Sequence, residues 1–279
     1  NISNILFFII IYKIYLYIIN IMEQKCEAGI KCLKIKDEDE SSKYKPLHPF
    51  LPQPPFLILG IGAVRSSKTT TIINMLRNEE MYGPNFFDDA LIISNTINND
   101  YKGKFLRDAF RVEDHYEDQF IKDLVESQQK HKREDMPTTL LILDDIISRD
   151  FKKNNDISFL ASRFRHYELS IGIFTQSFRA VSPIIRTNAT DILIFRQQSS
   201  KEMEKLVEEY HDLAHGEEQF KKYYDIAHST PYSFLYIDVQ QNPAHFYKSF
   251  EELIGIGKEL VWKGKIPESD EPFDEKSKK

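Results

Sequence analysis

Short apolar runs recur along the middle of the chain, separated by longer segments rich in polar and charged residues. The runs occupy residues 56–61, 90–94, 139–143, 170–175 and 191–195. The runs do not show the regular alternation of polar and apolar positions that marks a half-buried strand. Continuous apolar runs of this length are typical of strands covered on both faces, as in a parallel sheet.

Helical patterns fill the segments between these runs, at residues 68–80, 114–132 and 156–166. Alternation of strands and helices predicts an α/β fold with a mainly parallel sheet flanked by helices. Further helices are expected at residues 200–210 and 216–227, followed by a hairpin at residues 232–238 and 244–249. The pattern therefore adds a C-terminal helical and hairpin extension to the α/β core.

Shifts in composition divide the chain into segments. Residues 22–49 form a polar linker that runs into a Pro-rich lead-in, since residues 46–55 hold five of the 12 prolines and should be stiff and extended. We expect one folded domain over residues 50–250. Residues 251–279 are expected to be a C-terminal extension, with a charged, disordered tail from residue 263.

The first residues follow a different pattern. Residues 5–19 are apolar except for Lys13, but a helix of that length spans about 22 Å, short of a hydrocarbon core roughly 30 Å thick. Residues 1–21 consist mainly of types whose codons can be all A and T. We interpret them as translated upstream sequence of an A/T-rich genome, outside the fold, with the start at Met22. A membrane anchor or a buried element are the alternatives.

Charge and cysteine content narrow the possible functions. The net charge is −6, so any contact with DNA must use a local basic surface. Cys26 and Cys32 are too few for a disulfide scaffold or a four-ligand zinc site, and we expect free thiols in a reducing compartment. The N-terminal segment has neither the basic start nor the small-residue cleavage site expected of a secretory signal peptide.

A phosphate-binding sequence directly follows the first apolar run. Its residues are Gly62, Ala63, Val64, Arg65, Ser66, Ser67, Lys68, Thr69 and Thr70. They match the P-loop pattern G-x-x-x-x-G-K-[ST], in which backbone N–H groups at a helix N-terminus surround phosphate. Ser67 departs from the usual second glycine, and its Cβ restricts a positive φ. A competing dinucleotide pattern, G-x-G-x-x-G, is broken by Arg65.

This sequence predicts a site for ATP and Mg²⁺. Lys68 would reach the β- and γ-phosphates, and Thr69 would be a ligand of Mg²⁺. The run at 139–143 ends in two acids, which a parallel sheet would deliver to the same edge. Asp144 would hold Mg²⁺ through water, and Asp145 would orient or deprotonate the attacking water.

Two further side chains are candidates for the catalytic machinery. Gln176 follows the run at 170–175, where an amide can contact the γ-phosphate or the attacking water. Arg186 lies before the run at 191–195, and a planar cation there can act as an arginine finger. Arg65, inside the phosphate loop, is the rival for that role.

The motifs together resemble the DNA-packaging ATPases of poxviruses, giant viruses and virophages, which belong to the FtsK–HerA superfamily of ring-forming translocases. The likeness covers residues 50–250 and rests on GAVRSSKTTTI, LLILDDI and GIFTQSFRAVSPIIRTNATDILIF. It implies a RecA-like sheet, a homo-oligomeric ring such as a pentamer or hexamer, and ATP-driven movement of double-stranded DNA into a capsid. It also implies a capsid or portal-vertex partner, no membrane partner, and action at the site of virion assembly in an infected host cell.

The charge pattern agrees with a DNA partner. Residues 146–198 hold eight Lys or Arg against four Asp or Glu, a local balance of about +4, and phosphate contacts dominate non-specific DNA affinity. The candidate DNA contacts are Arg149, Lys152, Lys153, Arg163 and Arg165. A small-molecule P-loop kinase and a nucleotide-gated scaffold remain as alternatives. A packaging motor with its own nuclease is disfavoured, because few residues follow the last apolar run.

Overall fold

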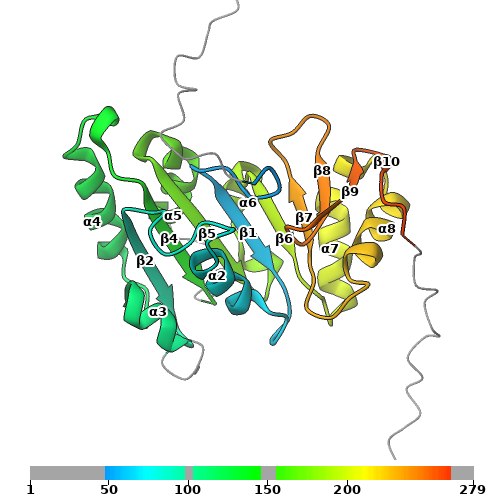
Figure 1. Cartoon of the computed structure of the whole chain (residues 1–279), viewed down its shortest axis with the longest axis horizontal. Coiled ribbons are helices and arrows are strands. Elements are labelled where there is room, and N and C mark those ends of the chain that lie inside the picture. Colours follow the sequence, from blue (N-terminus) through cyan, green and yellow to red (C-terminus); the bar gives the residue numbers. More distant parts are fainter. Residues whose placement is uncertain (1–47, 98–102, 146–154, 265–279) are drawn as a thin grey trace, which may run out of the picture. The chain divides into compact units, whose positions relative to one another are not determined.

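The computed structural model describes residues 48–97, 103–145 and 155–264. Within them, strands β1 to β10 form one sheet in the order β10-β9-β8-β7-β6-β1-β5-β4-β2-β3. Figure 1 shows this sheet running through the molecule, with helices on both faces. The expected α/β fold with a mainly parallel central sheet is confirmed.

Six strands make up the parallel part of the sheet. They are β1 (Leu57–Ile61), β2 (Asp89–Ser94), β3 (Arg111–Glu113), β4 (Thr139–Asp144), β5 (Leu169–Thr175) and β6 (Asp191–Ile194). Every residue of β1, β4, β5 and β6 is buried, as the unbroken apolar runs predicted. In β2 only the first residue, Asp89, is exposed. The edge strand β3 has three residues and is too short and polar to leave such a run.

The sheet continues as an antiparallel part beyond β6, shown in orange to red in Figure 1. Its strands are β7 (Leu235–Asp238), β8 (His245–Lys248), β9 (Glu252–Ile256) and β10 (Glu259–Leu260). β7 and β8 pair as the expected hairpin. However, β9 and β10 extend the same sheet, so a domain boundary placed at residue 250 would cut through it.

The helices nearly match the expected segments. They are α2 (Lys68–Arg77), α3 (Gly103–Ala109), α4 (Asp118–Gln129), α5 (Asn155–Arg163), α6 (Pro183–Asn188), α7 (Ser200–Tyr210) and α8 (Glu217–Ala227). The segment expected at 156–166 divides, because α5 ends at Arg163 and a 3₁₀ turn covers Phe164–Tyr167. No sequence pattern predicted α3 and α6, which are only seven and six residues long.

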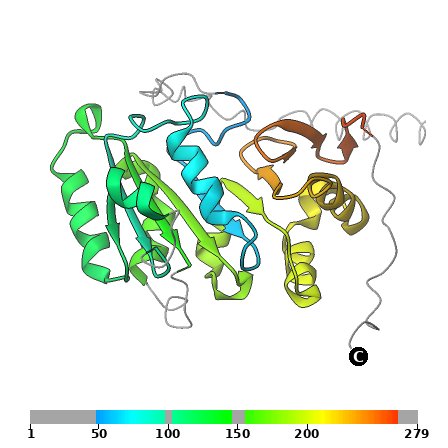
Figure 2. The same cartoon turned by 60° about the horizontal axis from the view of Figure 1, so that its bottom comes forward.

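Two hydrophobic cores cover the two faces of the sheet. Alternate residues of β1 point to opposite sides, so Leu57 and Leu59 pack with α4 to α8 while Ile58 packs with α2 and α3. Leu51, from the proline-rich lead-in, joins the core on the α2 side. Figure 2 shows α2, in cyan, lying across its face of the sheet.

The interior leaves no space for side chains at two positions near the end of β1. A Cβ on Gly60 would lie 2.3 Å from the ring of Phe174, and one on Gly62 would lie 2.4 Å from Phe195. The end of β1 therefore packs directly on β5, and the start of the phosphate loop packs on the residue that follows β6. In the part of the chain that the structure describes, no helix is both long and apolar enough to cross a bilayer; residues 1–21 lie outside that part.

Candidate active site

The predicted phosphate loop joins β1 to α2 and is fixed by its neighbours on both sides. The N–H of Gly62 donates to the carbonyl of Thr175 at 3.0 Å, at the end of β5. The N–H of Ala63 donates to the carbonyl of Arg196 at 3.2 Å, just after β6. The loop is thus held at the carboxyl edge of the sheet, where parallel α/β proteins place their ligands.

The loop turns through two left-handed residues. Arg65 has a φ of 61° and Ser67 a φ of 78°. The serine that replaces the usual glycine therefore adopts the backbone conformation for which glycine is normally selected. The departure from the P-loop pattern is one of side chain rather than of backbone.

The N-terminus of α2 is suited to bind an anion. Ser67 is the N-cap residue, but its side chain makes no capping hydrogen bond, and the first turn carries no acidic residue. Backbone N–H groups at such an end attract phosphate through their partial positive charge. Val64 and Arg65, at the tip of the loop, are exposed.

Lys68 points back along the loop. It is 5 % exposed, and its Nζ donates to the carbonyls of Gly62 at 2.9 Å and Ala63 at 3.1 Å. Burial lowers the pKa of its ammonium, and the carboxylates of Asp145 and Asp144 oppose part of that shift. The same Nζ lies 3.9 Å from Oδ1 of Asp145, so the ammonium sits between the phosphate loop and the acid pair.

Asp144 and Thr69 meet as the sequence predicted. Oδ2 of Asp144 accepts hydrogen bonds from Oγ1 of Thr69 and from Oγ of Ser94, each at 3.2 Å. Asp144 is 2 % exposed, and burial, followed by the charge of Asp145, raises its pKa to about 6. Its Oδ1 is buried without a hydrogen-bond partner among the described residues. A hydroxyl beside an unsatisfied carboxylate oxygen suits a hard divalent cation such as Mg²⁺.

Asp145 is the more accessible member of the acid pair. Its φ is 52°, and its N–H donates to the carbonyl of Phe174 at 3.0 Å. This turn presents the side chain to Gln176, whose Nε2 donates to Oδ2 of Asp145 at 3.2 Å. β5 lies between β1 and β4 in the sheet, which is why a residue at its end can reach the acid that follows β4.

Ser94 and Gln197 belong to the site but were not predicted from the sequence. Ser94 ends β2 and donates the second hydrogen bond to Oδ2 of Asp144. Gln197 follows β6, and its Nε2 donates to the carbonyls of Ile61 at 3.0 Å and Phe195 at 2.9 Å. Position at the end of a buried strand was the available signal for both, and a lone Ser or Gln there is too common to single out.

Arg186 does not contact its own phosphate loop in this structure. Its Nη1 donates to Oε2 of Glu209 on α7 at 2.6 Å. Its guanidinium also lies over the ring of Phe178, 4.8 Å from the centroid. A role as arginine finger stays a prediction, and it requires release of the Glu209 ion pair.

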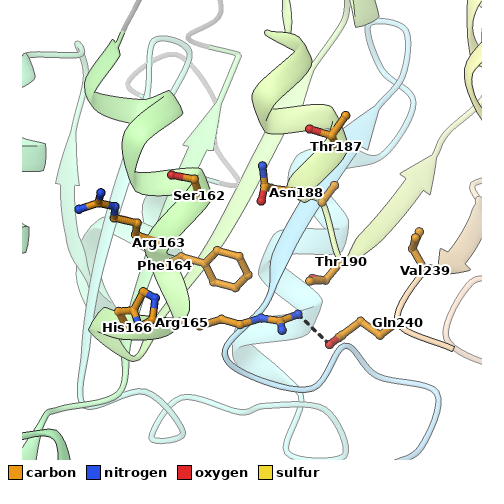
Figure 3. A pocket seen from close by; sticks show the side chains of 11 residues that line it. Ser162, Arg163, Phe164, Arg165, His166, Thr187, Asn188, Thr190, Val239 and Gln240 are labelled. Atoms are coloured by element: carbon orange, nitrogen blue, oxygen red, sulfur yellow. Dashed lines mark hydrogen bonds between the residues drawn. The ribbon is translucent and has the colours of Figure 1, made fainter. Parts of the chain in front are cut away.

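Arg163 and Arg165 lie at the opposite edge of the sheet. They border a cavity of about 420 Å³ that opens between the amino ends of β5 and β6. Figure 3 shows Arg165 reaching across it to Gln240, with Nη2 donating to Oε1 at 3.3 Å, while Arg163 points outward. His166 and Asn188 add polar groups to the wall. The other DNA candidates, Arg149, Lys152 and Lys153, lie outside the described residues.

A phosphate loop after β1, with an acid pair at the end of β4 in a mainly parallel sheet, defines the P-loop nucleoside triphosphatase fold. Within that class, the chain belongs to the family of the poxvirus A32 protein, whose model matches residues 50–233. This confirms the resemblance drawn from the motifs. None of the curated proteins matches the chain.

Solved structures of a viral packaging protein share the fold. The genome packaging NTPase B204 of Sulfolobus turreted icosahedral virus 2, in complex with ATP-gammaS, is 19 % identical with a TM-score of 0.51. That match covers 71 % of this chain and 100 % of B204. The AMP complex is 21 % identical with a TM-score of 0.52, covering 71 % and 99 %. A structure of B204 described as the DNA-packaging ATPase from Sulfolobus turreted icosahedral virus is 20 % identical with a TM-score of 0.51, covering 70 % and 98 %.

Proposed function

We propose that this chain is a genome-packaging ATPase, which hydrolyses ATP with Mg²⁺ to move double-stranded viral DNA into a preformed capsid. The observation that carries the proposal is the meeting of Lys68, the Thr69–Asp144 pair and the Asp145–Gln176 pair at one sheet edge. Membership of the poxvirus A32 family and the likeness to B204, described as a genome packaging NTPase, support it.

Phosphate binding falls to the loop and to the first turn of α2. The ammonium of Lys68 now rests on two backbone carbonyls, and a phosphate oxygen would replace these with stronger, charge-assisted hydrogen bonds. The uncapped N-terminus of α2 adds its backbone N–H groups. Thr69 and Asp144 would hold Mg²⁺, which supplies positive charge beside the β- and γ-phosphates when bound.

Asp145 is the group placed to act on the attacking water. One of its oxygens is oriented by the Gln176 amide, and the other faces Lys68 at 3.9 Å. A carboxylate in this position can align a water molecule and accept its proton as the water oxygen bonds to the γ-phosphorus and the bond to ADP breaks. Gln176, by fixing the rotamer of Asp145, would couple the state of the γ-phosphate to the loop that follows β5.

The partners of this site are part of the same proposal. We expect double-stranded DNA as the substrate, a capsid or portal-vertex protein as the docking partner, and a homo-oligomeric ring, pentamer or hexamer. We expect the protein to act at the site of virion assembly in the infected cell. Non-specific DNA binding needs cations rather than base-reading groups, and Arg163 and Arg165 supply cations beside a cavity.

The test is ATP hydrolysis measured with and without double-stranded DNA, alongside the native mass. Turnover that rises with DNA, is abolished in Lys68→Ala, and comes from a ring is the expected result. Arg163→Ala combined with Arg165→Ala should lower the DNA-stimulated rate and spare the basal rate. Loss of two phosphate contacts reduces the slope of log affinity against log salt by about 1.8. Arg111→Ala, an exposed arginine on β3, is the matched control.

Two outcomes would contradict the proposal. A monomer that transfers phosphate to a small molecule and ignores DNA would favour the kinase alternative. A chain that binds ATP without turning it over, with or without DNA and Mg²⁺, would favour a nucleotide-gated scaffold.

A further inference from the structure

Tyr232 is the most exposed large hydrophobic side chain of the described residues, at 80 %. It lies in the loop between α8 and β7, with a φ of 66°. A positive φ is a steric outlier for a bulky residue. Strained residues of this kind persist where their surroundings hold them, and they gather at ligand sites.

The surroundings tie this loop to the phosphate loop. Oγ of Ser67, the residue before Lys68, donates to the carbonyl of Tyr232 at 3.5 Å. Phe234, two residues further on, packs its ring against Phe195 at 4.9 Å between centroids. Phe195 in turn lies against Gly62, where a Cβ would come within 2.4 Å of it. Tyr232 is therefore presented from a fixed base beside the phosphate site.

Further contacts make the loop rigid. Oγ of Ser233 donates to the carbonyl of Thr230 at 2.6 Å. Nζ of Lys248, on β8, donates to Oγ of Ser229 at 2.9 Å. The exposed ring thus projects from a segment that is hydrogen-bonded both internally and to the sheet.

The order of the strands decides which end of a nucleotide would face Tyr232. The acid pair lies at the end of β4 and Gln176 follows β5, both on one side of β1, so the γ-phosphate must point to that side. β6, the Arg196 carbonyl that anchors Ala63, and the Tyr232 loop lie on the other side of β1. A triphosphate spanning the loop therefore sends its nucleoside toward β6 and Tyr232.

We propose that the ring of Tyr232 is the platform on which the base of the bound nucleotide stacks. The inference rests on the proposed ATP-binding function and assigns it a base-binding residue. Stacking on an aromatic side chain is worth about 5- to 150-fold in affinity per base, and every base offers a π-face. Tyr232 would thus favour nucleotides over bare phosphate chains.

The experiment compares two probes, ATP and inorganic tripolyphosphate, by calorimetry on the full chain. Tyr232→Ala should raise the Kd of ATP by about 5- to 150-fold and leave the Kd of tripolyphosphate unchanged. Tyr232→Phe should retain wild-type affinity for both. In ATPase assays, KM should rise in Tyr232→Ala while kcat at saturating ATP stays near wild type. Val261→Ala, another exposed apolar position, is the matched control.

The outcomes separate this inference from the proposed function. Unchanged ATP affinity in Tyr232→Ala, or equal loss of ATP and tripolyphosphate, would overturn the stacking role while leaving the phosphate site intact. Weakened ATP binding in Tyr232→Phe would point to the hydroxyl rather than the ring, and would also overturn it. A wild-type chain that binds neither probe would overturn the proposed function itself, and this inference with it.

Discussion

Ser67 shows how a single residue can keep a motif's geometry while departing from its sequence. At a φ of 78°, a side chain with a Cβ costs about 1–2 kcal/mol relative to an unstrained conformation. Glycine avoids that cost but has more freedom in the unfolded chain, worth about 0.5–1 kcal/mol. The two effects act in opposite directions, and the strain is the larger. The substitution also removes the hydrogen bond from Oγ of Ser67 to the carbonyl of Tyr232, which at 3.5 Å is weak.

We therefore expect Ser67→Gly to raise the free energy of unfolding by about 0.5–1 kcal/mol and to retain ATP turnover. Urea denaturation measures the first and an ATPase assay the second. Ser66→Gly is the control, because Ser66 is not among the positive-φ residues and its replacement should destabilise the protein. If both substitutions change the free energy of unfolding by the same amount, backbone strain at Ser67 is not the cause of the effect.

Asp145 and Asp144 differ in surroundings, and this predicts different roles. Asp144 is buried and accepts hydrogen bonds from two hydroxyls, whereas Asp145 is half-buried and oriented by an amide. Asp145→Asn should keep Mg²⁺-dependent nucleotide binding but slow hydrolysis by about 10²–10⁴-fold. Paired binding and single-turnover measurements check this. Lost nucleotide binding in Asp145→Asn, with a mild effect of Asp144→Asn, would exchange the two roles.

At the scale of elements, the start of β6 holds a buried acid. Asp191 is fully buried and accepts hydrogen bonds from Oγ1 of Thr190 at 2.6 Å and from the hydroxyl of Tyr236 at 2.7 Å. Burial raises its pKa to about 7, against the lowering effect of these two hydrogen bonds. The nearby carboxylate of Asp238 adds to the rise, and Arg165 opposes it.

This shift makes stability depend on pH with a definite sign. Between about pH 4 and pH 7 the folded protein keeps the Asp191 proton and the unfolded chain releases it, so stability from this group falls as pH rises. The slope approaches about 1.4 kcal/mol per pH unit. Asp191→Asn should remove that component of the unfolding free energy, measured by urea denaturation across the window. Asp212→Asn, at an exposed acid, should leave the wild-type profile unchanged.

At the scale of the whole molecule, the placement of Arg186 favours action between subunits. It is paired with Glu209 of its own chain, away from its own phosphate loop. Head-to-tail contacts that close into a ring would bring each Arg186 near a neighbour's nucleotide. A finger supplied in trans is worth roughly 10³–10⁵-fold in turnover.

Arg186→Ala should therefore bind ATP but turn it over roughly 10³–10⁵-fold more slowly. Mixing it with Lys68→Ala should restore part of the activity, at interfaces that pair an intact phosphate loop with an intact finger. Arg179→Ala, at an exposed arginine nearby, should keep wild-type turnover. If rings shown by native mass to be mixed remain inactive, Arg65 becomes the better candidate for the catalytic arginine.

Local sequence determined the strands and the residues that end them. The unbroken apolar runs predicted β1, β2, β4, β5 and β6 to within one residue at each end, because burial on both faces leaves a signal in consecutive positions. Parallel strands bring their carboxyl ends to one edge, so Lys68, Asp144 and Gln176 could be assigned to one site from their positions after strands. The short elements α3, β3 and α6 were missed, since so few residues carry no periodicity.

The tertiary structure alone decided which of these residues touch. Strand order places β5 between β1 and β4, and this order makes the Gln176–Asp145 contact possible. Arg186 meets Glu209, and Ser67 meets Tyr232 165 residues away. Such contacts depend on how helices and strands pack across the whole sheet, and periodicity along the chain reports only which face of each element is buried. The sequence therefore identified the residues of the site, and tertiary packing determined which of them are in contact.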